Sequence, residues 1–345
     1  MRTTCKVLVM LLLVTCGMLG MASDHVFTNL VAFDGTNGEQ PWVLSLAQDF
    51  DGSLNGTTAY GGSANSGVTF KLSRRNRLST INNLDRSVGT SPRAGVILAA
   101  DGSFYGTTTT GGQFNWGTVF RVTRDGSLSV VHQFSGSDGS PTSLIQGIGG
   151  RFYGTTRDDR DDSGSVFEMS PDGKFRTLHA FNNTEGCRLV QALTQDVNGD
   201  LYGTAGLCGR EDGSGYGTVF KLALDGTLTT LHVFNVDDGS LPQALVRGTD
   251  GNFYGTTFGG GTYANGTVFR ITSDGSFTTL YSFCGMPCGD GENPDPLIQA
   301  TDGNLYGGLK TGAGVGELYS SCQWTGHSQP CTASAIPMMG LPPSG

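Results

Sequence analysis

The sequence is poor in charge, and positive charge is the scarcer kind. Only 15% of the 345 residues are charged, and 21 Lys and Arg stand against 30 Asp and Glu, for a net charge of −9. Binding to a nucleic-acid backbone needs basic patches that displace counterions. The one basic cluster is the short run Arg74, Arg75 and Arg77. No nucleic-acid partner is therefore expected.

Long apolar runs are also scarce. Two basic residues precede an apolar run from Val7 to Leu19, and a stretch of small residues ends at Ala22. This pattern predicts a secretory signal over residues 1–22, so we expect a secreted or extracellular protein. The run is shorter than the roughly 18 apolar residues of a membrane helix, and no span is expected in the mature chain. The alternative is a lipoprotein acylated at Cys16.

Cysteines are few, and six of the eight lie beyond the predicted signal. An even number in an exported chain predicts disulfides. The pairs that the sequence suggests are Cys187 with Cys208, Cys284 with Cys288, and Cys322 with Cys331. Cys284 and Cys288 resemble one half of a zinc site, but no second pair with His at ligand spacing accompanies them. No metal site is predicted there.

Glycine, in contrast, is abundant, with 55 residues, and it punctuates a tandem repeat of about 50 residues. One string, typified by DGSFYGTT, begins at Asp51, Asp101, Gly149, Asn198, Asp250 and Asp302. A second string, typified by GTVFKL, follows each copy and begins at Gly67, Gly117, Gly164, Gly217, Gly266 and Gly316.

Each repeat is predicted to form four antiparallel strands. Asp-Gly and Asn-Gly pairs favour tight hairpin turns, and the segments between them are rich in β-forming residues without a helical period. In the fifth repeat the expected strands are Gln243–Arg247, Phe253–Thr257, Thr267–Ile271 and Phe277–Phe283. Four strands at this period are typical of β-propeller blades.

The two ends of the array predict how the blades close. Phe27–Phe33 matches the fourth strand of a repeat, and Glu317–Ser320 matches the third. The N-terminal strand would therefore complete the last blade and leave no unpaired strand edge. We therefore expect an all-β, six-bladed propeller over residues 23–320, followed by a short tail over 321–345 and present as a monomer. A seven-bladed propeller is the alternative, but it needs a further blade that the sequence does not show.

The combined pattern resembles a known repeat family. It reads D-G-x-[FL]-Y-G-T-T, a Gly-Gly loop, G-T-V-F-[KR]-[LIV], then D-G-x-[FL]-x-x-L-[HY]-x-F. It is similar to the GloVer repeat of exported bacterial proteins called choice-of-anchor tandem-repeat proteins, from about Phe27 to Ser320. The resemblance implies export and tandem β-repeats, and it brings no established activity. The short tail from Cys322 to Gly345 departs from the family's habit of ending in a surface anchor.

His and Tyr, two side chains with possible chemical roles, recur at fixed positions of the repeat. His132, His179 and His232 occupy one repeat position, and a catalytic residue would be expected once, so we assign them a structural role. Tyr recurs as Tyr105, Tyr153, Tyr202, Tyr254 and Tyr306. These residues could form a ring of hydroxyls near the propeller axis, but we expect each to pack between blades with its hydroxyl satisfied. No G-x-S-x-G, H-E-x-x-H or P-loop motif is present, and no catalytic residue is predicted.

The variable loops between the second and third strands are the predicted binding surface, because variable loops on a rigid scaffold commonly carry function. Exposed aromatic rings among polar groups would suit a polysaccharide or a cell-surface glycan. The candidate ligand-binding residues are Tyr60, Phe114, Trp116, Tyr216, Phe258 and Tyr263. The alternative is that Gly-rich loops simply expose an occasional ring.

One loop is acidic, with Asp158, Asp159, Asp161 and Asp162 in the third repeat. Calcium takes several oxygen ligands, so this run could bind it, but the spacing matches no known calcium motif. A solvated loop is the favoured interpretation, and no other cofactor is indicated.

Two functions follow from the sequence. The first is an exported, non-catalytic binding or surface-interaction module that uses the variable loop face. The alternative is a propeller enzyme of the polysaccharide lyase or hydrolase type, with acids from different blades converging at the channel mouth. The first strands of the repeats are mostly apolar and carry no converging acids, which favours the binding module.

Overall fold

The computed structural model describes residues 30–41, 46–158, 163–189, 192–211, 214–285, 290–310 and 319–324. In these ranges every named element is a β-strand except one 3-10 helix, η1 (Ile148–Gly150). No helix of the described residues is long and apolar enough to cross a bilayer. The fold is all-β, as the sequence pattern predicted.

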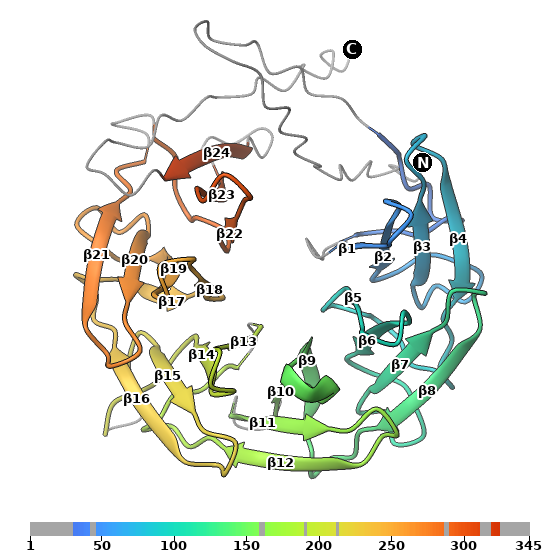
Figure 1. The fold of residues 1–345 in the computed structure, drawn as a ribbon, viewed down its shortest axis with the longest axis horizontal. Helices are drawn as coiled ribbons and strands as arrows, with labels where there is room; N and C mark the ends of the chain where they lie inside the picture. Colours follow the sequence, from blue (N-terminus) through green and yellow to red (C-terminus); the bar gives the residue numbers. More distant parts are fainter. Residues whose placement is uncertain are drawn as a thin grey trace, which may run out of the picture. The chain divides into compact units, whose positions relative to one another are not determined.

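The strands of the described residues form six antiparallel sheets, whose strands are labelled in Figure 1. The chain divides into two compact units. Unit 1 comprises residues 1–146, 150–152 and 169–175, and unit 2 comprises residues 147–149, 153–168 and 176–345.

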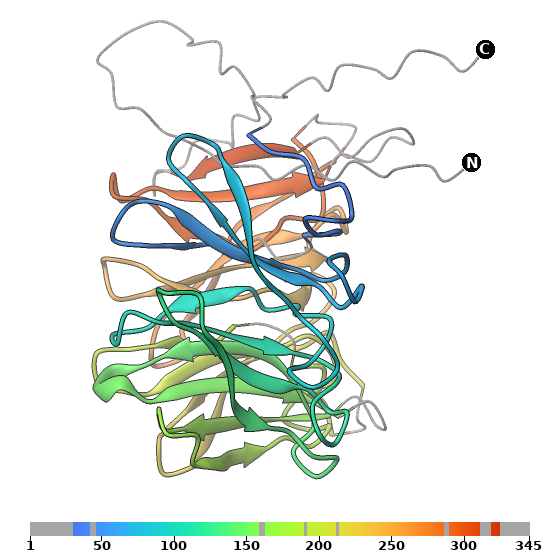
Figure 2. The ribbon, with the colours of Figure 1, turned by 90° about the vertical axis from the view of Figure 1, so that its right-hand side faces the viewer.

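Unit 1 contains the first two sheets. The first has the order β1 (Ala47–Gln48), β2 (Leu54–Thr58), β3 (Val68–Leu72) and β4 (Leu78–Asn83). The second has the order β5 (Val96–Leu98), β6 (Phe104–Thr108), β7 (Thr118–Val122) and β8 (Leu128–Gln133). In Figure 2 the first sheet, blue to cyan, shows β4 crossing its neighbours at an angle, as strands do in a twisted sheet.

The third sheet has residues in both units. Its strands are β9 (Ser140–Gln146), β10 (Phe152–Arg157), β11 (Gly164–Met169) and β12 (Phe175–Ala180).

Unit 2 contains the last three sheets. The fourth sheet has the order β13 (Thr194–Gln195), β14 (Leu201–Ala205), β15 (Thr218–Leu222) and β16 (Leu228–Val233). The fifth has β17 (Ser240–Pro242), β18 (Val246–Arg247), β19 (Phe253–Gly259), β20 (Thr267–Ile271) and β21 (Phe277–Ser282). The sixth has β22 (Ile298–Gln299), β23 (Leu305–Lys310) and β24 (Tyr319–Trp324).

The fifth sheet differs from the four strands expected. β19 extends to Gly259, and this extra length pairs with β17, where Ser240 lies opposite Gly259 and Pro242 opposite Thr257. The expected first strand shortens to β18. The sixth sheet has three described strands. Of the expected strand Phe27–Phe33, residues 30–33 form no named strand and the rest lie outside the described residues.

The two repeated strings fit together by strand register. In the first, second, fourth and fifth repeats the Gly of the first string lies opposite the Phe of the second string, as in the pair Gly203 and Phe220, whereas in the sixth repeat Gly307 lies opposite Cys322. A Cβ on Gly203 would lie 2.5 Å from Cζ of Phe220, so the ring occupies the space that a side chain here would need. Phe220 is completely buried. The pairing explains why the second string follows the first in these four repeats.

The cores form where side chains of successive repeats meet within a unit. In unit 1 a cluster joins Ala47 of β1 with Val96, Phe104 and Phe120 of the second sheet. In unit 2 Tyr202 of the fourth sheet packs with the fifth sheet in the same way. Burial of these rings provides the main stabilisation of such sheets.

Candidate functional site

The repeated Tyr fills the space between its own sheet and the next, and Tyr202 shows how. Its ring stacks on Phe253 of β19 with centroids 4.0 Å apart and an interplanar angle of 24°. Its hydroxyl donates to Oδ2 of Asp196 at 3.4 Å. Nζ of Lys221 lies 5.8 Å from the ring centroid. An aromatic platform, a carboxylate and a cation thus surround the phenol.

Other repeats hold the Tyr hydroxyl similarly, by an Asp four residues earlier. The pairs are Tyr105 with Asp101 at 3.0 Å, Tyr254 with Asp250 at 2.8 Å, and Tyr306 with Asp302 at 2.8 Å. Burial, and then the hydrogen bond to Asp101, raise the pKa of Tyr105 to about 12. The expectation that these hydroxyls are satisfied is confirmed for these residues.

The first repeat breaks this pattern, because Asn55 occupies the Tyr position. Asn55 is only 8% exposed, and its side-chain Nδ2 has no hydrogen-bond partner among the described residues. Phe104 is the residue on which a Tyr here would stack, and it is itself 5% exposed. The missing phenol leaves a buried amide and a buried ring facing unfilled space.

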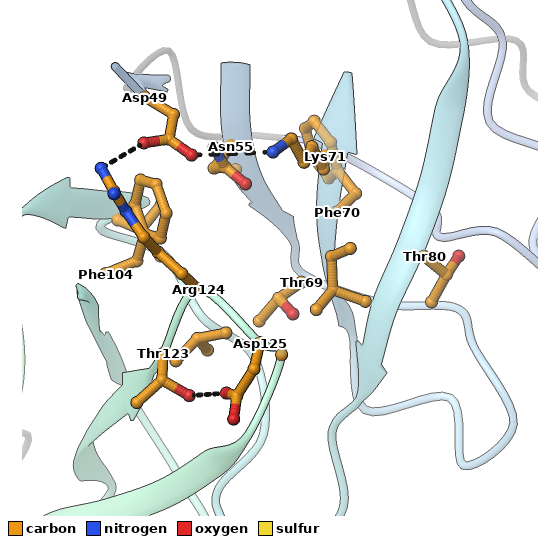
Figure 3. Close-up of a pocket in the computed structure, with 15 residues that line it drawn as sticks. Asp49, Asn55, Thr69, Phe70, Lys71, Thr80, Phe104, Thr123, Arg124 and Asp125 are labelled. Carbon is orange, nitrogen blue, oxygen red and sulfur yellow. Dashed lines mark hydrogen bonds and ion pairs between the residues drawn. The ribbon is translucent and has the colours of Figure 1, made fainter. Parts of the chain in front are cut away.

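That space is a pocket of about 320 Å³ in unit 1, here called the Asn55 pocket (Figure 3). It is lined by Asp49, Asn55, Gly56, Thr69, Phe70, Lys71, Thr80, Ile81, Val96, Phe104, Val122, Thr123, Arg124, Asp125 and Gly126. The lining combines apolar side chains of two sheets with charged side chains from the turns next to them. In the view of Figure 3, Asp49, Asn55 and Phe104 lie in the upper half, and Thr123 and Asp125 in the lower half.

Asp49 is the most buried charge of the pocket, with a side chain 9% exposed. Its Oδ1 lies 3.2 Å from Nη2 of Arg124 and also accepts the backbone N–H of Phe50 at 2.7 Å. Its Oδ2 lies 3.6 Å from Nζ of Lys71, which is longer than a hydrogen bond. Two cations thus neutralise Asp49, while Oδ2 keeps room to accept a donor.

The remaining acids near the pocket are held ionised by their neighbours. Lys71 donates to Asp51 at 2.8 Å, and this hydrogen bond, followed by one from Ser53, lowers the pKa of Asp51. The same contact raises the pKa of Lys71. The hydroxyl of Thr123 donates to Asp125 and lowers its pKa. Neither Asp51 nor Asp125 is therefore a proton donor near neutral pH.

The ligand-binding residues predicted from the sequence lie elsewhere, and none of them lines the Asn55 pocket. Three are well exposed: Phe114 by 52%, Tyr216 by 38% and Tyr263 by 55%. The other three are partly buried: Tyr60 pairs its backbone with Glu39, Trp116 lies against Gly136, and Phe258 belongs to β19. Their role in binding stays a prediction.

The three repeated His residues pack at one position, as expected. His132 stacks on Phe175 at 4.5 Å in unit 1, and His232 stacks on Phe277 at 3.7 Å in unit 2. Burial lowers the pKa of both. His179 packs edge-on against Phe181.

An acidic residue followed by Gly lies in the loop after these strands, as Glu185-Gly186 and Asp238-Gly239, and it does more than form a turn. Asp238 accepts the backbone N–H of Asn235 at 2.8 Å, which fits a turn. Its second oxygen lies 3.1 Å from Nε2 of His232, and Glu185 makes the same contact with His179. The contact with His was not predicted from the sequence.

The disulfide between Cys187 and Cys208 is present, as predicted. Cys284 is also disulfide-bonded, and its expected partner Cys288 lies outside the described residues, as does Cys331. Cys322 lies in β24.

The proposed calcium run falls largely outside the described residues, since Asp159, Asp161 and Asp162 are not among them. Within the described part of the chain, no group of three or more His, Cys, Asp or Glu is placed to hold a metal ion.

The Asn55 pocket was not predicted from the sequence, although the sequence contains a signal for it. The first string reads DGSLNGTT where other repeats have Tyr before the Gly. The substitution gains meaning only when Phe104 is known to face the same position, because the repeat alone does not show which residue the Tyr contacts.

Comparisons with known proteins agree with the fold. The chain is similar to a proposed 6-phosphogluconolactonase from Bacteroides uniformis (TM-score 0.57, 15% identity, covering 86% of this chain and 85% of that one). It is similar to hydrazine synthase from Kuenenia stuttgartiensis (TM-score 0.58, 15% identity, 88% and 80% covered) and to a protein from Lactobacillus plantarum (0.52, 16%, 83% and 81%).

The first two of these neighbours have propeller-like folds, and at such low identity they indicate the fold alone. No curated protein matches the sequence. The Gloeobacter/Verrucomicrobia repeat matches residues 43–215 and 206–328, which together span most of the chain. The chain therefore belongs to the Gloeobacter/Verrucomicrobia repeat family, the GloVer family that its motifs resemble.

Proposed function

We propose that the protein is a non-catalytic binding module and that the Asn55 pocket is its ligand site. One observation carries this proposal: Nδ2 of Asn55 is buried without a partner, and it faces a cavity where five other repeats carry a Tyr. An unsatisfied buried amide costs about 1–3 kcal/mol, and a bound ligand that accepts its hydrogen bond would remove that cost.

The pocket has the size and the lining of a small-molecule site. Its volume of about 320 Å³ falls at the lower end of the range for ligand pockets. Phe104 and Val96 offer an apolar surface, and Asn55 and Asp49 add polar groups at fixed positions. Such a lining suits a compact molecule with one ring and one or two polar substituents.

The charges of the pocket favour binding over catalysis. A general acid needs a raised pKa near the working pH, whereas Asp125 has a lowered pKa and Asp49 lies against two cations. A hydrolase that cleaves glycosidic bonds would need one protonated carboxyl, and the lowered pKa of Asp125 argues against that role for Asp125. These contacts support the binding module over the enzyme.

The proposal includes the architecture and location that the sequence predicts. Six sheets from six repeats support a six-bladed propeller over residues 23–320. Completion of the last blade by the N-terminal strand stays a prediction. The disulfide between Cys187 and Cys208 supports export, since such bonds persist in oxidising compartments. The signal over residues 1–22 would direct this export.

A second candidate function is glycan binding at the loops, and the exposed rings favour it. Phe114 and Tyr263 expose more than half of their surface at positions between the second and third strands of their sheets. A glycan array with the chain from residue 23, compared with the separate variants Phe114→Ala and Tyr263→Ala, tests this. Binding that a variant loses supports a loop site, and binding to no glycan contradicts it.

The pocket proposal is tested by ligand screening against the chain from residue 23 and the variant Asn55→Tyr. A library of monosaccharides and single-ring aromatic molecules is screened by thermal shift and by ligand-observed NMR. We expect hits with the native chain that disappear in Asn55→Tyr, because the new side chain fills the pocket. Hits that persist in the variant, or no hits at all, would overturn the proposal.

A further inference from the structure

The fourth repeat of the same chain indicates which ligand chemistry suits the Asn55 pocket. We propose that the pocket binds a 4-substituted phenol, with the ring on Phe104 and the hydroxyl donating to Asp49. This inference rests on the proposed function and specifies its ligand class. It follows from a residue-by-residue match between the two repeats.

Three partners of Tyr202 recur around the pocket at the same repeat positions. Asp196 precedes Tyr202 by six residues, as Asp49 precedes Asn55. Lys221 and Lys71 precede the last residue of β15 and β3, respectively. Phe253 and Phe104 are the first residues of β19 and β6. Carboxylate, cation and aromatic platform are all retained, and only the phenol is replaced by the shorter amide.

Unit 2 shows how these three partners hold a phenol. The ring of Tyr202 lies 4.0 Å from that of Phe253, its hydroxyl donates to Oδ2 of Asp196, and Lys221 lies 5.8 Å from the ring centroid. Offset stacking, a charge-assisted hydrogen bond and a cation near the ring all favour an electron-rich aromatic ring with a hydroxyl. A pocket that keeps the carboxylate, the cation and the aromatic platform but lacks the Tyr ring would therefore select a free phenol.

Two atoms of the pocket are available for such a ligand. Oδ2 of Asp49 lies 3.6 Å from Lys71, so it can accept a hydrogen bond from a phenolic hydroxyl. Nδ2 of Asn55 is buried without a partner and can donate to a polar substituent or to the phenolic oxygen. The pocket volume of about 320 Å³ also accepts a ring with a short side chain.

Recognition should depend on the hydroxyl as well as on the ring. A sugar ring packs only its C–H face on Phe104 and lacks the π face that Tyr202 presents to Phe253, and a plain aromatic ring leaves the carboxylate and the amide unsatisfied. A hydrogen bond to a charged group changes affinity by about ten-fold or more. The pocket is thus expected to distinguish 4-methylphenol from toluene.

The test measures binding of 4-methylphenol and toluene to the chain from residue 23 by NMR titration. We expect 4-methylphenol to bind about ten-fold more tightly than toluene or better, and Asn55→Tyr to bind neither at this site. Asp49→Asn should reduce the preference for 4-methylphenol. Equal affinity for the two molecules in the native chain, or no binding of 4-methylphenol, would overturn the inference.

A matched variant should create a second site of the same kind in unit 2. Tyr202→Asn removes the phenol where the same three partners already hold one, so it should create a second site for 4-methylphenol. Binding of one equivalent by the native chain and of two by the variant is the expected result. Binding of one equivalent by both proteins would contradict the role assigned to the shared partners.

Two further measurements are needed. One distinguishes a free phenol from a Tyr side chain, and the other distinguishes the phenol inference from the binding-module proposal. N-acetyltyrosine amide and the peptide Gly-Tyr-Gly test whether the phenol can be a Tyr side chain; binding of 4-methylphenol alone assigns the site to a free small molecule. Suppose that a sugar binds while 4-methylphenol does not, and that Asn55→Tyr abolishes the binding of the sugar. In that case the phenol inference fails and the binding-module proposal stands.

Discussion

Tyr202 of β14 stacks on Phe253 of β19 with ring centroids 4.0 Å apart, and both rings are almost fully buried. We predict that Tyr202→Asn destabilises the protein by about 3 kcal/mol, because removal of a large buried ring leaves a cavity. Urea denaturation followed by intrinsic fluorescence measures the change. Tyr263→Asn, at a position 55% exposed, serves as the control and should cost less than about 0.5 kcal/mol. Equal losses in the two variants would contradict the packing role of the repeated Tyr.

Gly203 illustrates a second requirement of the repeat. A Cβ there would lie 2.5 Å from Cζ of Phe220 and 2.9 Å from Cδ2 of Leu193. Because both neighbours are buried, Gly203→Ala should overpack this site and destabilise the protein by about 1–3 kcal/mol. Thermal unfolding measures the loss. Gly206→Ala is the matched control, since its nearest neighbour would lie at an ordinary 3.5 Å, and a loss as large as that of Gly203→Ala would argue against a steric cause.

The position of His232 predicts a pH dependence of stability. Burial lowers the pKa of His232 in the folded protein below its usual 6.5, and the Asp238 carboxylate only partly opposes this. The unfolded chain therefore takes up the proton first, so this contribution to stability is complete above pH 6.5 and is lost as the pH falls. The native protein should lose stability between pH 7.5 and pH 5.5.

The variant His232→Tyr should lose less stability over the same interval. Tyr already occupies this repeat position as Tyr281, whose hydroxyl donates to Asp290 at 2.6 Å, and it does not titrate between these pH values. Urea denaturation of both proteins at the two pH values gives the comparison. A loss in the variant equal to or larger than that of the native protein would rule out the assigned role of His232.

Several features could be predicted from sequence because they depend on local chemistry. The Asp-Gly turns appear where expected: in one of them the N–H of Gly226 donates to Ala223 and that of Thr227 to Asp225. The pairing of Cys187 with Cys208 could also be predicted, because both fall in loops on the same side of one repeat. Turn preferences and strand alternation extend over only a few residues and can be read directly.

Features that depend on contacts between repeats could not be predicted in the same way. That Asn55 faces Phe104 depends on how two successive sheets pack, which no local pattern encodes. The contact of His232 with Asp238 likewise depends on the path of the loop between them. The repeat does mark the first place, since the departure at Asn55 from an otherwise regular Tyr position is visible before its partner is known.

Asn55 should make the first repeat less stable than a Tyr at this position would. Asn55→Tyr should raise the free energy of unfolding by about 1–3 kcal/mol, because it removes a buried amide without a partner and supplies a ring for Phe104 to stack on. Asn55→Ala separates the two effects: it removes the amide but adds no ring, so its gain should be smaller. Denaturant titration of the three proteins measures both.

A loss of stability in Asn55→Tyr would show that the pocket is not shaped for a phenol, and would count against the ligand class as well. A gain has the opposite meaning, since residues that bind ligands are commonly not those that would stabilise the fold best. The Asn55 pocket would then be a place where the chain gives up a stabilising ring of its own, and the same substitution that stabilises the protein should abolish binding. These two effects of one substitution are the property that distinguishes a ligand site from a packing defect.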